Sequence, residues 1–138
     1  MKRILILCTG NSARSQMAEG LFRQEAGADW EVFSAGIKSS HVRPEAIAVM
    51  RELGIDISSH RSKPVTEFTG RQFDYVITVC DQANESCPVF PGGAQRLHWP
   101  FEDPAAVEGS EEVRQAAFRS IRDQIRARIQ NFIAPQDR

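Results

Sequence analysis

Near the start of the chain, a cysteine and an arginine stand six positions apart, joined by small and turn-forming residues. The cysteine is the first residue and the arginine the last but one in the run Cys8-Thr9-Gly10-Asn11-Ser12-Ala13-Arg14-Ser15. If this loop turns into the start of a helix, its backbone N–H groups point at a common centre and can hold a tetrahedral oxyanion. The positive field there favours the thiolate of Cys8, to which Ser15 can donate a hydrogen bond. The run predicts a nucleophilic thiolate beside an oxyanion.

The predicted oxyanion site consists of Thr9, Gly10, Asn11, Ser12, Ala13, Arg14 and Ser15. Within it, the Arg14 guanidinium offers two parallel hydrogen bonds that match an oxyanion better than a lysine would. An isolated cysteine is more often a small buried residue, and an isolated arginine is more often a surface charge. The order of strand, small-residue loop, arginine and helix makes that reading the weaker one here.

Alternating apolar segments predict the elements that must position this loop. Expected strands cover residues 4–7, 30–35, 75–79 and 95–99. Expected helices cover residues 15–27, 44–53 and 110–133, and residues 58–70 form a loop with at most a short helix at 65–68. Strands that alternate with helices predict a parallel α/β sheet covered by helices on both faces, with ligands at the carboxyl ends of the strands. Cys8, directly after the first strand, stands at that edge.

Composition limits the other functions. With 138 residues and 41% hydrophobic content, the chain is expected to form one domain over residues 1–138. A net charge of -1 gives no general attraction to nucleic acid or to an anionic membrane. The apolar run before Cys8 is too short for a signal-peptide core, so a cytoplasmic protein is expected. No apolar stripe is left over after the core is assigned, which predicts a monomer.

A zinc site is poorly supported by the remaining cysteines and the histidines. No cysteine pair has the C-x2-C spacing, and His41, His60 and His98 are scattered along the chain. We therefore expect no bound metal and assign these histidines a surface or packing role by default. Trp99 and Phe101 are expected to serve the core, because a lone aromatic residue beside a strand is usually packing.

The C-x5-R-S pattern after a first strand resembles the phosphate loop of the low-molecular-weight tyrosine phosphatases and of the arsenate reductases that share their fold. The likeness extends over residues 2–132 and implies a four-stranded parallel sheet of order 2-1-3-4. The continuation Gln16-Met17-Ala18-Glu19-Gly20 resembles the reductase branch, since phosphatases usually have a proline directly after the serine. The resemblance thus favours a reductase.

Asp103 precedes Pro104 in a loop after the fourth predicted strand. Alone it would be a turn residue, but in both families the corresponding aspartate protonates the leaving oxygen, a role worth about 10² to 10⁴ in rate. Phosphatases commonly have tyrosines just beyond it to select aryl phosphates, whereas Ala105 and Ala106 stand here. These alanines favour a small inorganic substrate.

Cys80 and Cys87 are what separates the two chemistries. In the implied strand order Cys8 and Cys80 follow neighbouring strands, about 4.8 Å apart, which is roughly disulfide range. The Cys80-x6-Cys87-Pro88 segment resembles thioredoxin-coupled arsenate reductases. That resemblance implies a relay in which Cys8 attacks arsenate, Cys80 attacks Cys8, and Cys87 attacks Cys80 to form a disulfide that thioredoxin reduces. No bound cofactor is implied.

The relay carries a structural condition. If residues 81–86 are helical, Cys80 and Cys87 are about 10 Å apart, beyond the reach of a disulfide, so this segment must unwind. The alternative is a strand-end core cysteine and an unrelated surface cysteine. In that case the chain would be a tyrosine phosphatase, and a non-enzymatic redox sensor or arsenite-binding protein is a third possibility.

Two departures from the resembled family stand out. Some members have another cysteine where Ala13 stands, and its loss leaves the three-thiol relay intact. Some bind potassium through residues corresponding to Asn11 and Glu19, with further ligands near residues 60–63. Arg61 and Lys63 bring two cations to that place, so we expect no potassium site, with the Lys63 ammonium in the same space.

Overall fold

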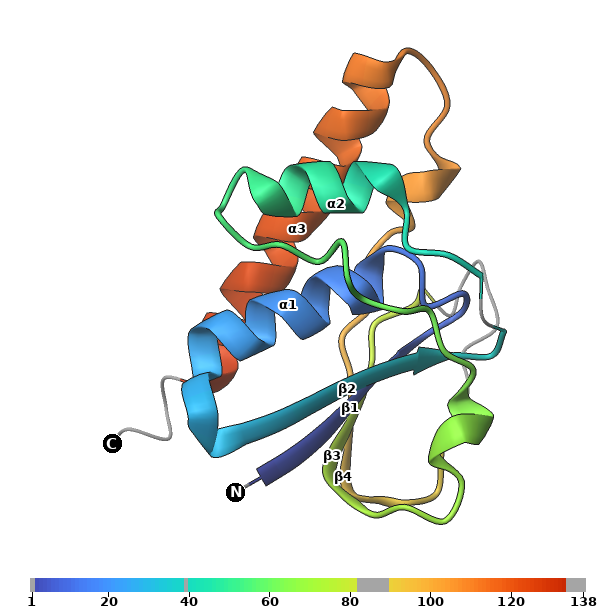
Figure 1. Cartoon of the computed structure of the whole chain (residues 1–138), viewed down its shortest axis with the longest axis vertical. Helices are drawn as coiled ribbons and strands as arrows, with labels where there is room; N and C mark the ends of the chain where they lie inside the picture. Colours follow the sequence, from blue (N-terminus) through green and yellow to red (C-terminus); the bar gives the residue numbers. More distant parts are fainter. Residues whose placement is uncertain (1, 39, 82–89, 134–138) are drawn as a thin grey trace.

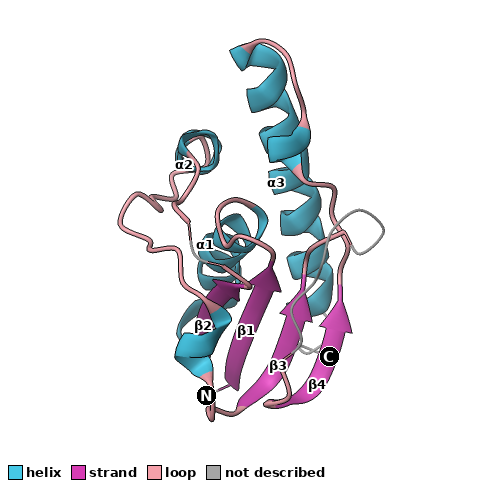
Figure 2. Ribbon diagram, turned by 90° about the vertical axis from the view of Figure 1, so that its right-hand side faces the viewer, coloured by secondary structure: helices cyan, strands magenta, loops and turns pink. Residues whose placement is uncertain are grey.

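Four short parallel strands form the central sheet of this structure, a computed structural model in which residues 2–38, 40–81 and 90–133 are described. The strands are β1 Lys2–Cys8, β2 Trp30–Gly36, β3 Phe73–Thr78 and β4 Gly93–His98. Their order is β2-β1-β3-β4, and all three neighbouring pairs are parallel (Figure 2). The predicted fold class and strand order are confirmed.

The α-helices lie close to their predicted positions. They are α1 Arg14–Ala26, α2 Pro44–Arg51 and α3 Glu111–Ile133. Gly27 ends α1 with a φ of 71°, a left-handed conformation that suits glycine. Pro44 occupies the first turn of α2, and the Ser110 hydroxyl accepts the Val113 N–H at 3.2 Å to cap α3. Three short 3₁₀ helices are η1 Gly27–Asp29, η2 Val65–Phe68 and η3 Pro104–Ala106.

The two faces of the sheet are covered unequally. Ile4 and Ile6 belong to the larger core cluster, which includes apolar side chains of α1, α2 and α3. Figure 1 shows how these three helices lie together beside the sheet. Leu5 and Leu7 point to the other face, where Phe68 of η2 packs with them. Among the described residues, the three α-helices thus cover one face of the sheet, and the second face carries only the short η2.

The central strand β1 shows why the sequence folds this way. Its residues from Ile4 to Cys8 are all buried because helices and aromatic side chains cover both faces. Burying each large aliphatic side chain stabilises the fold by about 1.5–3 kcal/mol, which favours a central position in the sheet for this uninterrupted apolar run. Within the described part of the chain, every helix is too short or too polar to cross a bilayer.

Strands β3 and β4 begin two residues before their predicted starts and end one residue before their predicted ends. The backbone pairing nevertheless continues beyond these ends, since the Val79 N–H donates to the Leu7 carbonyl at 2.8 Å and the Trp99 N–H to the Thr78 carbonyl at 2.8 Å. Trp99 and Phe101 are buried in the larger core cluster, as predicted.

Candidate functional site

Hydrogen bonds to its backbone carbonyl groups fix the conformation of the loop between β1 and α1. Each carbonyl of residues 9–13 accepts a hydrogen bond from outside the loop or from α1. The donors are the N–H groups of Ile37 and Lys38 for Thr9, the hydroxyls of Ser40 and Ser62 for Gly10, the Gln16 amide for Asn11, the Arg43 N–H for Ser12 and the Met17 N–H for Ala13. Because these carbonyls are bonded away from the centre of the loop, the N–H sides of the same peptides face the other way, an arrangement that suits an anion.

Asn11 makes this loop possible at its tightest point. Its φ is 49°, in the left-handed region that asparagine tolerates better than most residues. Alternation of left- and right-handed residues turns successive N–H groups towards one centre, the geometry of an anion nest. The close approach of β2 completes the loop: a Cβ on Gly36 would come within 2.7 Å of the Thr9 carbonyl oxygen and 2.8 Å of the Asn11 nitrogen.

Cys8 and Ser15 meet inside the loop. Cys8 is a buried, free cysteine, and its Sγ lies 2.9 Å from the Ser15 Oγ. The Ser15 Oγ also accepts the Asn11 Nδ2–H at 2.7 Å. Since that lone pair is engaged, the Ser15 hydrogen is free to point at the sulfur, where it stabilises a thiolate. The predicted pairing of Ser15 with the thiol is thus present in the structure.

Arg14 and Asp103 are brought to the same end of the sheet. The Arg14 side chain is only 4% exposed, and its guanidinium donates to the Phe101 carbonyl at 3.1 Å and lies 3.8 Å from the Asp103 carboxylate. The other Asp103 oxygen accepts the Ala105 N–H at 2.9 Å, which fixes the start of η3. Asp103 keeps 39% of its side chain exposed, so a substrate oxygen can reach it. The arrangement suits a proton donor beside an anion site.

Cys80 follows β3, separated from its last residue by Val79 alone. It is fully buried in the same core cluster as Cys8. Strands β1 and β3 are adjacent and parallel, with Leu7 opposite Thr78, so both cysteines lie at the carboxyl ends of neighbouring strands. Cys87, and with it the predicted unwinding of residues 81–86, lies outside the described residues.

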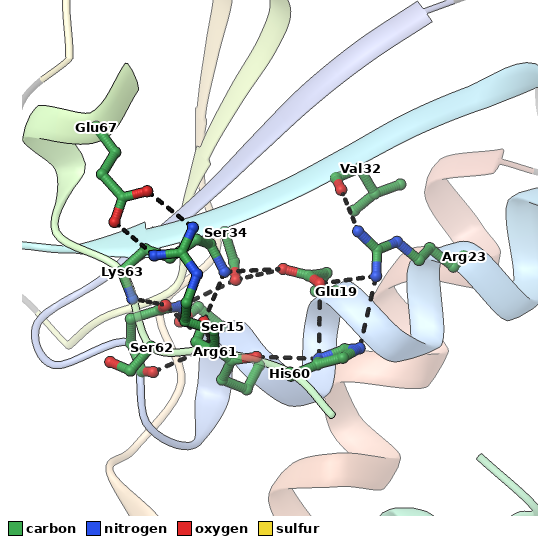
Figure 3. Close-up of polar contacts among 12 residues, drawn as sticks. Ser15, Glu19, Arg23, Val32, Ser34, His60, Arg61, Ser62, Lys63 and Glu67 are labelled. Atoms are coloured by element: carbon green, nitrogen blue, oxygen red, sulfur yellow. Dashed lines mark hydrogen bonds and ion pairs between the residues drawn. The ribbon is translucent and has the colours of Figure 1, made fainter. Parts of the chain in front are cut away.

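A buried carboxylate continues the network behind the loop (Figure 3). The Asn11 Nδ2 donates not only to Ser15 but also to the Ser34 Oγ at 3.0 Å, and the Ser34 hydroxyl donates to the Glu19 Oε1 at 2.6 Å. Glu19 is almost fully buried and faces three basic side chains. They are Arg23 at 2.8 Å, His60 at 3.5 Å and Lys63 at 3.8 Å. The two cations, Arg23 and Lys63, balance the charge and allow this carboxylate to be buried.

Lys63 and Arg61 behave differently from each other. The Lys63 ammonium lies beside Glu19, as predicted, and donates to the Arg61 carbonyl at 2.7 Å. Burial lowers the pKa of Lys63, although Glu19 opposes this shift. The Arg61 guanidinium turns away and pairs with both oxygens of Glu67 at 2.7 and 2.9 Å. That no potassium binds here stays a prediction.

Three further residues of the site were missed by sequence reasoning. Gln16 is fully buried and bonds to both the main chain and the side chain of Asn11. Ser34 is fully buried. A serine inside a predicted strand was a signal of a buried polar contact that the sequence did offer. His60 was assigned a surface or packing role. In the structure its Nδ1 lies 3.0 Å from the Gln16 Oε1, so His60 belongs to this network of contacts.

Comparison with known proteins agrees with this geometry. The sequence model of the family named low molecular weight phosphotyrosine protein phosphatase matches residues 3–137. An arsenate reductase from Halalkalibacterium halodurans is 46% identical over 131 residues, covering 95% of this chain and 94% of that protein.

Solved structures give the same grouping. One described as an arsenate reductase in the phosphate binding state has a TM-score of 0.82 and 38% identity, covering 98% of both chains. A thioredoxin-dependent arsenate reductase from Corynebacterium glutamicum has a TM-score of 0.65 and 33% identity, covering 94% of this chain and 62% of that one. The chain belongs to the low molecular weight phosphotyrosine protein phosphatase family, and within it groups with proteins named arsenate reductases.

Proposed function

We propose that this protein reduces arsenate to arsenite with Cys8, Cys80 and Cys87 as a thiol relay. The observation that carries the proposal is the position of Cys8 and Cys80, both buried at the carboxyl ends of adjacent strands, beside the oxyanion loop. A phosphatase needs only the first thiol. The similarity to proteins named arsenate reductases supports the same activity.

In the first step, the Cys8 thiolate attacks arsenic in the bound arsenate. An arsenic–sulfur bond forms, one arsenic–oxygen bond breaks, and Asp103 gives the departing oxygen a proton so that it leaves as water. The outward carbonyls of the loop leave its N–H groups for the remaining oxygens, and Arg14 neutralises their charge. Arsenic remains As(V) at this stage.

In the second step, the Cys80 thiolate attacks the Cys8 sulfur. The electron pair of the sulfur–arsenic bond passes to arsenic, which leaves as arsenite, As(III), and a Cys8–Cys80 disulfide forms. Cys87 then attacks Cys80 and releases the Cys8 thiolate. Two thiols have supplied two electrons, and the resulting Cys80–Cys87 disulfide must be reduced by an external dithiol. Phosphate cannot follow this path because a thiol does not reduce phosphorus.

Thioredoxin is the reductant that we propose for this disulfide. One similar solved structure is described as a thioredoxin-dependent arsenate reductase, and the relay ends on a disulfide that a protein dithiol can exchange with. A protein with this cycle needs a reducing compartment, which supports the cytoplasm as its location. It needs no bound cofactor or metal, and we propose that it works as a monomer.

The test follows NADPH oxidation with arsenate, thioredoxin and thioredoxin reductase. Wild type is expected to turn over only when arsenate is present, and serine variants of Cys8, Cys80 and Cys87 are each expected to lose that turnover. Peptide mapping of Cys87→Ser after one turnover should find a Cys8–Cys80 disulfide. Arsenate-independent or absent oxidation by wild type would contradict the proposal.

The second candidate is a tyrosine phosphatase, favoured by the Arg14–Asp103 pair beside Cys8, which would serve phosphate ester hydrolysis equally well. In that case Cys80→Ser and Cys87→Ser would keep full activity on aryl phosphates, and that activity would far exceed arsenate turnover. Weak hydrolysis alone does not decide for the phosphatase, since an arsenate pocket also fits phosphate.

A further inference from the structure

Gln16 stands at the centre of a line of contacts that leads to the nucleophile and meets the contacts of Ser34 and Glu19 at Asn11. Its Nε2 lies within 3.2 Å of the Asn11 carbonyl and 3.1 Å of the Arg61 carbonyl, two groups that only accept hydrogen bonds. These contacts identify the nitrogen end of the amide. The same Nε2 then donates to the Asn11 Oδ1 at 2.9 Å.

The orientation of Asn11 is fixed in the same way. The Lys63 backbone N–H, which can only donate, lies 2.8 Å from the Asn11 Oδ1. The oxygen of this amide therefore faces Gln16 and Lys63, and its nitrogen faces Ser15. Two successive amides, Gln16 and Asn11, thus point their N–H ends towards Cys8.

His60 extends this line outward. Its Nδ1 lies 3.0 Å from the Gln16 Oε1, which can only accept, so Nδ1 carries a hydrogen. Its Nε2 lies 3.5 Å from a guanidinium nitrogen of Arg23, which can only donate, so Nε2 carries none. Both neighbours therefore select one neutral tautomer of the imidazole, with the hydrogen on Nδ1.

The charges around His60 agree with this state. Burial lowers the pKa of His60, and Arg23 and Lys63 lower it further, while Glu19 and, least of all, Asp56 oppose them. Protonation would place an N–H of His60 against the Arg23 guanidinium. The neutral form is therefore the one that this arrangement stabilises near neutral pH.

Together these contacts form one directed series, which we call the donor chain. In order, it consists of Arg23, His60, Gln16, Asn11, Ser15 and Cys8. Every donor in it points towards the sulfur, and a series of aligned hydrogen bonds polarises its members and strengthens the last one. Figure 3 shows its Arg23 and His60 end beside Glu19.

We propose that Gln16 and His60 are positioning residues that stabilise the Cys8 thiolate through the donor chain. The proposal rests on the proposed role of Cys8 as nucleophile. It assigns a function to a buried amide and to a histidine that touch neither the substrate nor the sulfur.

The first test needs no variant of the donor chain. In the ¹⁵N NMR spectrum of the full chain labelled on histidine, His60 is expected as the neutral tautomer with the hydrogen on Nδ1 at pH 7, with its signal assigned by its loss in His60→Asn. A hydrogen on Nε2 would overturn the donor chain, because the imidazole could not then donate to Gln16 while accepting from Arg23.

The second test measures the alkylation rate of Cys8 by iodoacetamide from pH 5 to 9, with the modified peptide quantified by mass spectrometry. At pH 6.5, Gln16→Met is expected to lower the rate about three- to tenfold and His60→Ala about threefold, the scale of one hydrogen bond within a chain. Both pH profiles should move to higher pH. The double variant should match Gln16→Met, because His60 acts only through Gln16.

His60→Asn is the rescue variant, since its amide N–H can take the place of Nδ1–H, and it should recover most of the lost rate. His41→Ala is the matched control, because His41 is exposed and outside the donor chain, and it should leave the profile unchanged. Two results would show that these residues only support the fold. One is a rate reduction in the double variant equal to the product of the two single reductions; the other is pH profiles that do not move while the melting temperature falls.

Alkylation requires no arsenate, so this result is separate from the proposed function. If arsenate turnover fails but the alkylation profiles shift as described, the donor chain holds and the reductase does not. If Gln16→Met does not fold, the comparison of His60→Ala with His60→Asn still decides the outcome, since equal rates in those two variants would overturn the proposal.

Discussion

Arg14 holds two acceptors that belong to one segment, the Phe101 carbonyl and the Asp103 carboxylate. The bond to the carbonyl anchors the guanidinium, whereas the 3.8 Å separation from Asp103 is too long for a strong ion pair. A bound oxyanion can therefore draw on the guanidinium without breaking its anchor. Asp103 is then left to meet the leaving oxygen, which gives these two residues separable functions.

Replacing Asp103 by asparagine is expected to lower arsenate turnover about 10²- to 10⁴-fold, because the side chain can no longer supply a proton. The asparagine oxygen can still accept the Ala105 N–H, so η3 should remain in place. The measurement is kcat with arsenate, together with the inhibition constant of phosphate. That inhibition constant should stay within a few-fold of wild type.

Arg14→Lys serves as the contrasting variant in the same assay. A lysine keeps the charge but not the planar pair of donors, so phosphate inhibition itself should weaken. An Asp103→Asn protein that turns over at the wild-type rate would remove the acid from the mechanism. A phosphate affinity lost equally in both variants would show that the two functions are not separable.

The residues found from sequence and those missed differ in how they are connected. Cys8, Arg14 and Ser15 stand within one short run, and chemistry alone predicts their roles. Gln16, Ser34 and His60 come from α1, β2 and a loop, and they meet only after the chain folds. The role of such a polar residue follows from the residues that it contacts, and a single sequence does not show which residues are in contact.

At the scale of elements, the end of β2 supports the oxyanion loop. Gly36 pairs with Cys8 in the parallel ladder and with Pro64 on its other side. A Cβ there would meet three backbone atoms of the loop within 3.0 Å, and backbone cannot move aside as a flexible side chain can. The geometry of the anion site therefore depends on a glycine in a neighbouring strand.

Gly36→Ala is expected to destabilise the protein by about 1–3 kcal/mol, the usual cost of an added methyl group in a tightly packed place. More specifically, it should weaken the stabilisation by phosphate, because the clash lies in the loop itself. Urea unfolding with and without phosphate measures both effects.

Gly20→Ala is the control for that experiment. Its Cβ would come within 2.9 Å of Ile57 and 3.0 Å of Met50, but these contacts are with side chains of α2 and of the segment after it, and none is with the oxyanion loop. This variant should change the free energy of unfolding but keep the increase in that free energy that phosphate causes. If both variants lose this phosphate-dependent increase equally, the specific role of Gly36 is contradicted.

The elements themselves were largely predictable, and their ends were not. The apolar run of β1 and the stripe of α3 predict burial, and burial identifies the element. Strand ends depend on pairing instead: Phe73 and Gly93 face each other at the start of the β3–β4 ladder, although Gly93 has no side chain to signal a strand. The helices could likewise be predicted as elements, but the sequence did not predict that they cover the two faces of the sheet unequally.

At the scale of the whole molecule, α2 and α3 are joined by charged groups as well as by the core. Glu52, the residue following α2, pairs with Arg119 at 2.7 Å and Arg122 at 2.7 Å, both on α3. Arg122 is only 7% exposed and also donates to the Val49 carbonyl at 2.8 Å. A buried guanidinium is thus satisfied by the end of another helix, which ties the two helices together.

The hydrogen bond from Arg119 lowers the pKa of Glu52 to about 2, against an opposing effect of burial and with a further hydrogen bond from Arg122. Because the folded pKa lies below the unfolded value of about 4.5, charged Glu52 stabilises the fold fully above pH 4.5. That contribution is lost as the pH falls from about 4.5 towards 2. Since 41% of the Glu52 side chain is exposed, solvent screening reduces it to about 1 kcal/mol.

Glu52→Gln is therefore expected to lower the free energy of unfolding by about 1 kcal/mol at pH 7 and by progressively less as the pH falls to 2. The measurement is urea unfolding of both proteins over that range, at low and at high salt. Glu31→Gln is the matched control, since Glu31 pairs with Arg3 near the exposed start of the neighbouring strands β1 and β2 and this pair joins two strands instead of two helices. Two outcomes would contradict a role of the ion pairs in holding α2 against α3. In the first, both variants lose the same small free energy of unfolding; in the second, the loss in Glu52→Gln persists at pH 2. Apolar packing between the helices would then account for their association.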